Sequence, residues 1–231
     1  DQIRGPMTRG ADARPHVVVD DLEAPTLSDD DRRHLERALR VRPGDEITIS
    51  DGADRWRVAR MGATVEVIGE TNDVPAAEPA IAVGVSLLKG RKLDLVVQKL
   101  TELGVDRIRL VEAERCVTRW SHDKSDRVLD RYARVAREAA MQSRRCRLPV
   151  VDAPVPAVEV RGGEGVAAAH MDGGAVTLDR PTILVGPEGG WSDDELDAAR
   201  HRVALGAHVL RADTAAIAAG VLLGALRSGA V

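Results

Sequence analysis

Aromatic side chains and cysteines are scarce in this sequence of 231 residues. It contains three Trp, one Tyr and no Phe, whereas sheets that bind single-stranded RNA by stacking need two or three aromatic side chains close together. The two cysteines, Cys116 and Cys146, form no CxxC pair and have no zinc-like spacing, which argues against a disulfide framework or a structural zinc site. We therefore expect reduced thiols, an aliphatic core and no metal.

The sequence also lacks an excess of basic charge and a long apolar run. Thirty-three Lys and Arg stand against 37 Asp and Glu, so a protein that coats nucleic acid through bulk charge is not expected, and any nucleic acid must be held by a local basic patch. The longest apolar run, residues 215–226, is shorter than the ~20 residues that span a bilayer. The polar residues 1–15 contain no apolar signal-peptide segment. We expect a cytoplasmic protein with no membrane partner.

The first part of the chain has the pattern of a small β-rich domain, residues 16–72, after a disordered leader, residues 1–15. Short strands are predicted at residues 16–19, 46–50, 56–60 and 64–68. One helix is predicted to begin after Ser28, to carry Leu35, Ala38 and Leu39 on one face, and to stop at Pro43. The Pro- and Ala-rich residues 73–80 form the expected linker.

From residue 81 to residue 231 the predicted strands and helices alternate. Strands are predicted at residues 81–87, 108–111, 148–151, 166–169, 182–185 and 207–210, and helices at residues 92–103 and 124–144. Such alternation is typical of an α/β domain with a parallel sheet covered by helices.

A glycine-rich segment follows the predicted strand at residues 182–185. It reads GPEGG at residues 186–190, and a helix is expected directly afterwards, because Ser192 and Glu195 have the spacing of a capping box and Trp191 and Leu196 that of a hydrophobic staple. Glycines let a ligand approach the backbone closely at the end of a parallel strand. The segment lacks the spacing of dinucleotide and phosphate loops. It predicts a small-molecule site other than one for a polyphosphate nucleotide; a tight turn without a ligand is the alternative.

Two further segments stand out. Residues 211–224 lead into a helix made almost wholly of Ala, Gly, Val, Leu and Ile; we expect it to be enclosed on all sides, in a crowded site or a subunit interface. The alternative is an ordinary core helix capped by Asp213 or Thr214. Residues 134–147 hold five arginines, which could bind RNA phosphates or merely favour the end of a helix through its dipole. A second basic group surrounds His34.

Several motifs, taken in order, resemble the RsmE family of ribosomal RNA methyltransferases. They are residues 90–105 (GRKLDLVVQKLTELGV), 114–116 (ERC), 142–145 (QSRR) with 147–149 (RLP), 184–190 (LVGPEGG) and 205–216 (LGAHVLRADTAA). Residues 34–52 (HLERALRVRPGDEITISDG) resemble the PUA-like RNA-binding domain of that family. The resemblance extends over about residues 16–228.

The resemblance implies a SPOUT-class α/β domain with a parallel sheet and a deep trefoil knot, preceded by a small PUA-like β-barrel. It implies a homodimer that uses S-adenosyl-L-methionine to methylate N3 of a uridine in 16S ribosomal RNA of the small subunit. The alternatives are a SPOUT methyltransferase with a different target, or a non-catalytic RNA-binding factor of ribosome assembly.

The resemblance also implies roles for individual residues. Cofactor contacts are expected from Leu184, Val185, Gly186, Pro187, Glu188, Gly189, Gly190, Leu205, Gly206, Leu210, Arg211, Thr214 and Ala215. Gln142 and Arg145 are expected to position the base, with Arg211 near the cofactor. RNA contacts are expected from His34, Arg37, Arg40, Arg115, Ser143, Arg144 and Arg147. The family commonly has Glu where Met141 stands, so no general base is assigned; Glu138 and Glu188 are weak candidates.

Overall fold

The computed structural model describes residues 14–120 and 122–231, although for residues 122–124 only the backbone is described. Most of the predicted leader, residues 1–13, therefore lies outside the described residues. Contacts divide the chain into two compact units. Unit 1 comprises the chain up to residue 76 together with residues 137–148, and unit 2 comprises residues 77–136 and 149–231. The expected domain limits, which assign residues 137–148 to the second domain, remain a prediction.

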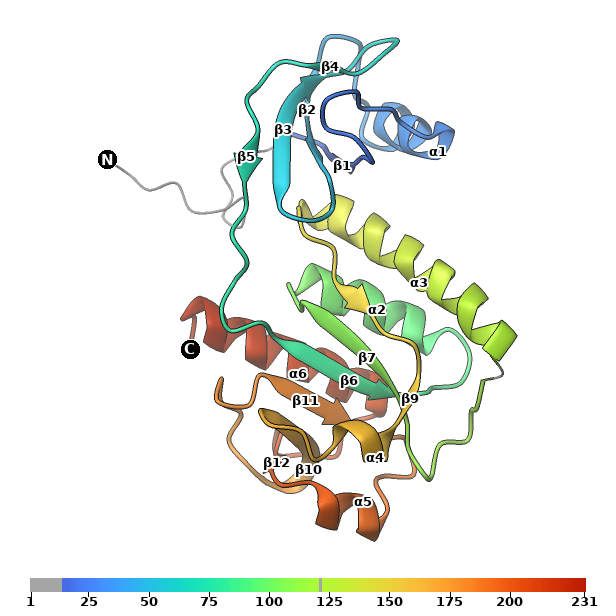
Figure 1. Cartoon of the computed structure of the whole chain (residues 1–231), viewed down its shortest axis with the longest axis vertical. Coiled ribbons are helices and arrows are strands. Elements are labelled where there is room, and N and C mark those ends of the chain that lie inside the picture. Colours follow the sequence, from blue (N-terminus) through green and yellow to red (C-terminus); the bar gives the residue numbers. More distant parts are fainter. Residues whose placement is uncertain (1–13, 121) are drawn as a thin grey trace. The chain divides into compact units, whose positions relative to one another are not determined.

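Unit 1 is built on a five-stranded sheet (Figure 1). Its strands are β1 (His16–Val18), β2 (Glu46–Ser50), β3 (Arg55–Arg60), β4 (Glu66–Val67) and β5 (Asn72–Asp73). The order is β1-β2-β3-β4, with β5 also paired to β3, and only the β1–β2 pair is parallel. Ile47 and Ile49 are fully buried in an aliphatic core that Met141 joins.

The first helix begins as predicted but changes its pitch. In α1 (Asp29–Arg33) the Ser28 hydroxyl accepts a hydrogen bond from the Asp31 amide. The chain then forms a π-helical turn, η1 (His34–Ala38). The predicted apolar face is wrong, because Leu35 is buried while Ala38 is exposed and Leu39 is 45% exposed. The wider π turn rotates the later side chains away from the register of an α-helix.

Unit 2 contains a seven-stranded sheet in which every pair is parallel. Its strands are β6 (Ala82–Ser86), β7 (Arg107–Glu112), β8 (Val150–Val151), β9 (Val155–Pro156), β10 (Val166–Gly174), β11 (Thr182–Val185) and β12 (Arg202–Val203). The order is β12-β10-β11-β6-β7-β8, and β9 also pairs with β7. The parallel α/β sheet is therefore confirmed.

One predicted strand of unit 2 is wrong. Residues 207–210 form a loop in which Val209 is 84% exposed, and the last strand is instead β12. The chain leaves the edge of the sheet after Val203. Several of the apolar side chains that follow line a pocket, as described below. An apolar run therefore does not mark a strand here.

The helices of unit 2 are α2 (Lys92–Glu102), the first part of α3 (His122–Ser143), α4 (Ala157–Val160), α5 (Asp193–Ala198) and α6 (Ala212–Ser228). The buried face of α2 is the predicted one, with Leu93, Val96, Val97 and Leu100. Helix α6 packs against α2, β6 and β11 (Figure 1). None of the helices in the described part of the chain is long and apolar enough to cross a membrane.

Helix α6 departs from both predictions made for it. Its buried residues include Ala216, Ala219 and Gly220, but Val221 is 45% exposed, so the helix is not enclosed on all sides of this single chain. It begins at Ala212 after Arg211, so neither Asp213 nor Thr214 is its N-cap. At Gly220 an added Cβ would lie 2.6 Å from the side chain of Leu100. The small residues therefore serve a close approach to α2.

Candidate cofactor pocket and RNA-binding residues

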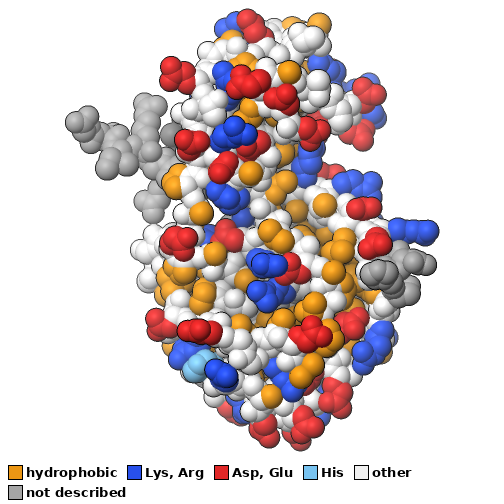
Figure 2. Space-filling model, in the orientation of Figure 1, with side chains coloured by type: hydrophobic (Ala, Val, Ile, Leu, Met, Phe, Trp, Pro, Cys, Tyr) orange, Lys and Arg blue, Asp and Glu red, His pale blue; other side chains and the backbone are white. Residues whose placement is uncertain are grey.

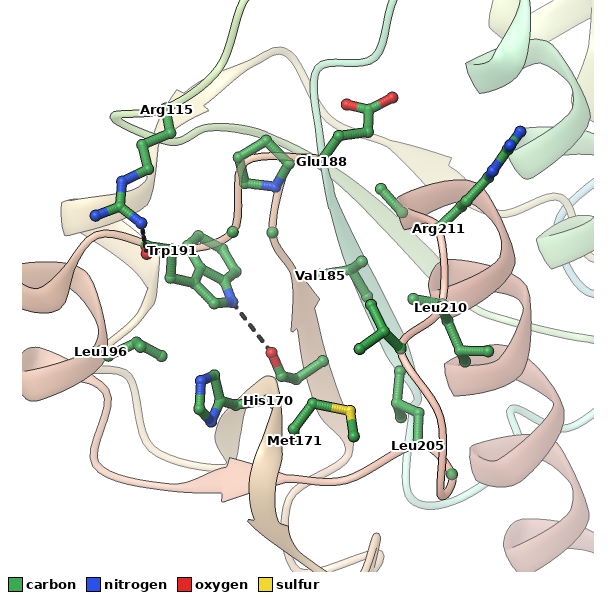
Figure 3. A pocket seen from close by; sticks show the side chains of 18 of the residues that line it. Arg115, His170, Met171, Val185, Glu188, Trp191, Leu196, Leu205, Leu210 and Arg211 are labelled. Carbon is green, nitrogen blue, oxygen red and sulfur yellow. Dashed lines mark hydrogen bonds between the residues drawn. The ribbon is translucent and has the colours of Figure 1, made fainter.

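Unit 2 contains a pocket of about 580 Å³ beside β10 and the end of β11 (Figure 3). Its walls are the glycine loop, residues 186–191, and the second loop, residues 205–211, which leads into α6. This volume is within the usual range for a small-molecule site. The pocket therefore lies at the end of a parallel strand, where the sequence predicts a ligand.

Most residues predicted to contact the cofactor line this pocket. They are Val185, Gly186, Pro187, Glu188, Gly190, Leu205, Gly206, Leu210, Arg211 and Ala215. Leu184 is instead fully buried in β11, Thr214 is exposed on α6, and Gly189 is in the glycine loop but not in the pocket wall. The proposed roles of these three residues remain predictions.

Sequence reasoning missed other lining residues. They are Ala169, His170, Met171, Trp191, Asp193, Leu196, His208, Val209 and Ala212. Ala169 is the last residue of the strand predicted at residues 166–169. His170 and Met171 follow it, because β10 continues to Gly174. Trp191 could have been found from the sequence, because an apolar residue directly before the N-cap residue is expected to have a buried side chain. The others are set by how the two loops come together in space.

The glycine loop contains a turn hydrogen bond and is followed directly by further hydrogen bonds at the start of α5. The Gly190 amide donates to the Pro187 carbonyl at 2.9 Å, and Gly190 has a φ of +73°. Ser192 and Glu195 form the predicted capping box at the start of α5. The Trp191 side chain is buried, and its indole Nε1 donates to the Ala169 carbonyl at 3.2 Å (Figure 3). The ring is thereby held as one wall of the pocket.

The backbone of Gly186 lies against that ring. A Cβ added to Gly186 would be 3.0 Å from the nearest atom of the Trp191 indole. Such a distance is tighter than normal van der Waals contact, so a larger side chain must displace the ring. Packing therefore requires glycine at position 186. A larger side chain would move the Trp191 ring, which forms a wall of the pocket.

Charged groups at the pocket come from several segments. Glu188 Oε1 lies 2.8 Å from Nζ of Lys92, at the start of α2. The hydrogen bond from Lys92 lowers the pKa of Glu188 below its ordinary value, and burial opposes this shift. Arg115, predicted to contact RNA, also lines the pocket, and its Nη1 donates to the Trp191 carbonyl at 2.8 Å. Arg211 is exposed at the pocket edge (Figure 3).

The other predicted RNA-binding and catalytic residues belong to unit 1. Gln142 and Arg144 are exposed at the end of α3, and Arg145 is partly buried. The Ser143 hydroxyl donates to the Ala139 carbonyl at 2.7 Å, and Arg147 Nη2 donates to the Val74 carbonyl at 3.2 Å. His34, Arg37 and Arg40 are all exposed in and after η1. None of these residues lines the pocket.

Comparison with known proteins identifies the family. A model of an RNA methyltransferase domain matches residues 76–224, and a model of an RNA methyltransferase PUA domain matches residues 27–66. Ribosomal RNA small subunit methyltransferase E of Mycobacterium bovis is 33% identical over 86% of this chain and 85% of its own. The chain belongs to the ribosomal RNA small subunit methyltransferase E family. The family predicted from the motifs is confirmed, and the chain is an RNA methyltransferase by family.

Other members of the ribosomal RNA small subunit methyltransferase E family agree in sequence and fold. The protein of that name from Synechocystis is 30% identical over 87% of this chain and 73% of its own. A solved ribosomal RNA small subunit methyltransferase E from Neisseria gonorrhoeae, bound to S-adenosyl methionine, is 26% identical. It covers 90% of this chain and 95% of its own, with a TM-score of 0.73.

One departure from the family pattern now has a structural context. Met141, where the resemblance leads us to expect Glu, is 8% exposed and packs in the core of unit 1. A carboxylate at this position would need a partner in an apolar setting. Position 141 therefore supplies no acidic group, and the Met141 side chain makes apolar contacts in the core of unit 1.

Basic and acidic side chains are mixed on the surface seen in Figure 2. Figure 2 shows Lys and Arg interspersed with Asp and Glu over the visible face, so this face carries no continuous basic surface. Within residues 14–120 and 125–231, no group of three His, Cys, Asp or Glu is placed to hold a metal ion.

Proposed function

We propose that this chain transfers a methyl group from S-adenosyl-L-methionine to N3 of a uridine in 16S ribosomal RNA of the small subunit. The observation that carries the proposal is the pocket between the glycine loop and the second loop, in a chain 26% identical to a family member solved with S-adenosyl methionine. The same proposal places the protein in the cytoplasm, where such a substrate is found.

The residues of the pocket fit the proposed cofactor. Val185, Leu205 and Leu210 provide apolar surface for a flat base, and Gly186 and Gly190 leave the backbone accessible. The carboxylates of Glu188 and Asp193 suit a cationic ligand, and Arg211 suits a carboxylate. A glycine-rich wall explains how backbone groups, more than charged side chains, could hold the adenosine. We also propose cofactor contacts from Leu184, Gly189 and Thr214, each of which is next in sequence to a residue that lines the pocket.

The bound cofactor would supply a methyl group that is open to nucleophilic attack. Before or during that attack, the uridine must lose its N3 proton, and negative charge develops on O2 and O4. We assign Arg145 and Gln142 to position the base and stabilise that charge, as donors do in an oxyanion site. Arg211 would act at the cofactor end. Glu188 is a poor proton acceptor, because Lys92 holds its pKa low.

RNA docking is proposed for two groups of residues in unit 1. The first is the end of α3, with Ser143, Arg144 and Arg147, and the second is His34, Arg37 and Arg40 around η1. Arg115, predicted from the sequence to contact RNA, belongs to unit 2 and lines the pocket. Phosphate contacts of this kind fix the position of an RNA without reading its sequence. Because the net charge of the chain is −4, such contacts must come from local groups of basic side chains.

The remaining architectural proposals concern the knot, the barrel and the dimer. We propose that the glycine loop, the second loop and α6 form the trefoil knot of SPOUT enzymes, and that residues 16–72, which belong to unit 1, form the PUA-like barrel. We also propose a homodimer in which α6 contributes its partly exposed Ile217, Val221 and Leu222. Light scattering coupled to size exclusion tests the dimer, since a monomeric mass at micromolar concentration would contradict it.

The decisive experiment for the function is methylation in vitro. Small ribosomal subunits lacking the modification are incubated with the protein and S-adenosyl-L-methionine, and the nucleosides are mapped by mass spectrometry. The expected product is N3-methyluridine at one position of 16S RNA. A methylated ribose or another base would indicate a SPOUT enzyme with a different target. Absence of cofactor binding by calorimetry would indicate a non-catalytic assembly factor.

A further inference from the structure

Two segments of unit 2 that are far apart in sequence are joined beside the pocket. The turn after β7, residues 113–116, meets the segment from the glycine loop into α5. The Glu114 amide donates to Glu195 Oε1 at 2.9 Å. Arg115 Nη1 donates to the Trp191 carbonyl at 2.8 Å and, more weakly, lies 3.5 Å from the Gly189 carbonyl. Arg115 and Glu195 thus connect this turn to both ends of the residues 189–195 segment.

Glu195 does more than close the capping box. The residue is 6% exposed, and Oε2 accepts the Ser192 amide at 3.0 Å while Oε1 accepts the Glu114 amide. A capping-box glutamate on a surface helix needs only the first of these bonds. A buried carboxylate is tolerated when hydrogen bonds replace its water. Its two oxygens here fix the start of α5 relative to the turn after β7.

Arg115 lies against the glycine loop at Gly189 and Trp191. A Cβ at Gly189 would lie 3.4 Å from the Arg115 Cβ, so the two backbones pass close to each other. Figure 3 shows the guanidinium reaching the Trp191 carbonyl, on the residue whose ring forms the pocket wall. Arginine can span two carbonyls because its donors form a planar fork. The contact therefore acts on the loop backbone directly at the pocket.

We propose that Arg115 and Glu195 are positioning residues for the cofactor pocket, which hold the glycine loop and the Trp191 ring in the shape that receives the ligand. The proposal rests on the proposed function, in which this pocket binds S-adenosyl-L-methionine. It assigns Arg115 to the cofactor loop in preference to RNA. A loop that is already ordered in the free protein loses little conformational entropy when the ligand binds, and this strengthens the affinity.

The test uses Arg115→Met, which keeps the length of the side chain but removes its donors. Arg115→Lys keeps the charge and one donor group without the fork. Arg119→Met is the matched control, because Arg119 is an exposed arginine of the same connection and does not line the pocket. Glu195→Gln keeps the shape of the buried side chain while removing its charge. Because Arg115 is exposed, its variants remain informative even if Glu195→Gln does not fold.

The first measurement is hydrogen exchange in the ligand-free protein, which does not depend on cofactor binding. Arg115→Met and Glu195→Gln are expected to accelerate exchange in peptides covering residues 186–196 by roughly tenfold, with other core peptides unchanged. Arg115→Lys is expected to lie between these variants and the wild type, and Arg119→Met to match the wild type. Unchanged exchange in both Arg115 variants would overturn the proposal.

The second measurement separates the cofactor from RNA. Calorimetry with S-adenosyl-L-methionine is expected to show about tenfold weaker binding by Arg115→Met, while filter binding shows unchanged affinity for 16S RNA. Weaker RNA binding with unchanged cofactor affinity would instead make Arg115 an RNA contact and overturn the proposal. If the wild type bound no cofactor, the proposed function would fail, whereas the exchange result would still decide whether these residues order the loop.

Discussion

Arg137 and Asp31 form a two-pronged ion pair within unit 1. The Nη1–Oδ1 distance is 2.7 Å and the Nη2–Oδ2 distance is 2.8 Å, and Nη2 also donates to the Val18 carbonyl at 2.6 Å. One member of the arginine-rich segment at residues 134–147 is therefore engaged in holding α3 to β1 and α1. Local clustering of arginines in a sequence does not separate such a structural role from phosphate binding.

Removing this arginine should destabilise unit 1. We expect Arg137→Ala to lower the free energy of unfolding by about 3 kcal/mol, because it leaves the 6%-exposed Asp31 without its partner. Urea unfolding followed by circular dichroism measures this loss. Arg134→Ala is the control, since Arg134 is an exposed arginine one helical turn earlier. Equal stability of the two variants would contradict a structural role for the Arg137 pair.

The same pair predicts a dependence of stability on pH. Burial disfavours the charged form of Asp31, but hydrogen bonds from Arg137 and Ser28 outweigh it and hold the pKa of Asp31 below its ordinary value. A carboxyl group with a depressed pKa in the folded state stabilises the protein above its unfolded pKa, and this contribution is lost as pH falls through the folded pKa. Unfolding free energies between pH 6 and pH 3 should therefore fall less steeply in Asp31→Asn than in the wild type.

Gly186→Ala should damage the pocket through Trp191. The added methyl group meets the indole at 3.0 Å, and such overpacking costs about 1–3 kcal/mol. We expect weaker binding of S-adenosyl-L-methionine together with a lower melting temperature. Gly162→Ala is a suitable comparison, because no atom lies within 4 Å of its new Cβ and its φ is not positive. Wild-type cofactor affinity in Gly186→Ala would show that the ring does not contribute to the pocket wall.

The low pKa of Glu188 gives a prediction about the proton acceptor. The Lys92 hydrogen bond keeps the Glu188 carboxylate ionised, although burial opposes this effect, and a low pKa makes it a poor base for a uridine. We expect Glu188→Gln to keep kcat within about fivefold and to leave the shape of the pH–rate profile unchanged, whereas loss of a general base costs ~10²–10⁴-fold. A drop of that size would identify Glu188 as the base.

Arg40 and Arg144 share an unusual backbone conformation. Their φ angles are +58° and +57°, which non-glycine residues rarely adopt, and they follow the ends of η1 and α3 respectively. At Arg144 the bonds from the Arg144 amide to Met141 and from the Arg145 amide to Ala140 are those of a Schellman motif, a position where glycine is favoured. Both positions hold arginine despite this strain, which is consistent with a need for the side chain.

Replacing either arginine by glycine should therefore improve stability and weaken RNA binding. Relief of the left-handed strain is expected to add up to about 1 kcal/mol to the unfolding free energy. Loss of a phosphate contact is expected to reduce the salt dependence of RNA affinity by about one unit of slope. Arg40→Ala and Arg144→Ala remove the side chain without relieving the strain, and so serve as controls. Unchanged RNA affinity in all four variants would remove both residues from the RNA-binding surface.

Local patterns predicted those parts of the molecule that depend on local interactions. The buried face of α2, the strand β11 and the Ser192–Glu195 capping box all follow from spacing within a few residues. The loop at residues 207–210 was mispredicted because its apolar residues serve a pocket and not the sheet. The contact of Arg115 with Trp191 joins two segments that are far apart in the sequence, and the periodicity of a single segment cannot reveal such a contact.

Arg145→Ala addresses the proposed catalytic step. The side chain is assigned to hold the uridine and stabilise the charge that develops on its oxygens, and removal of one such donor costs about 10²–10³-fold in rate. Methyl transfer to isolated small subunits should therefore fall at least that far. Cofactor affinity should be unchanged, because Arg145 does not line the pocket. Arg145→Lys should recover only part of the rate, since an ammonium group lacks the planar fork of a guanidinium. Wild-type transfer by Arg145→Ala would exclude the assignment, and a parallel loss of cofactor binding would assign the residue to the cofactor instead of the base.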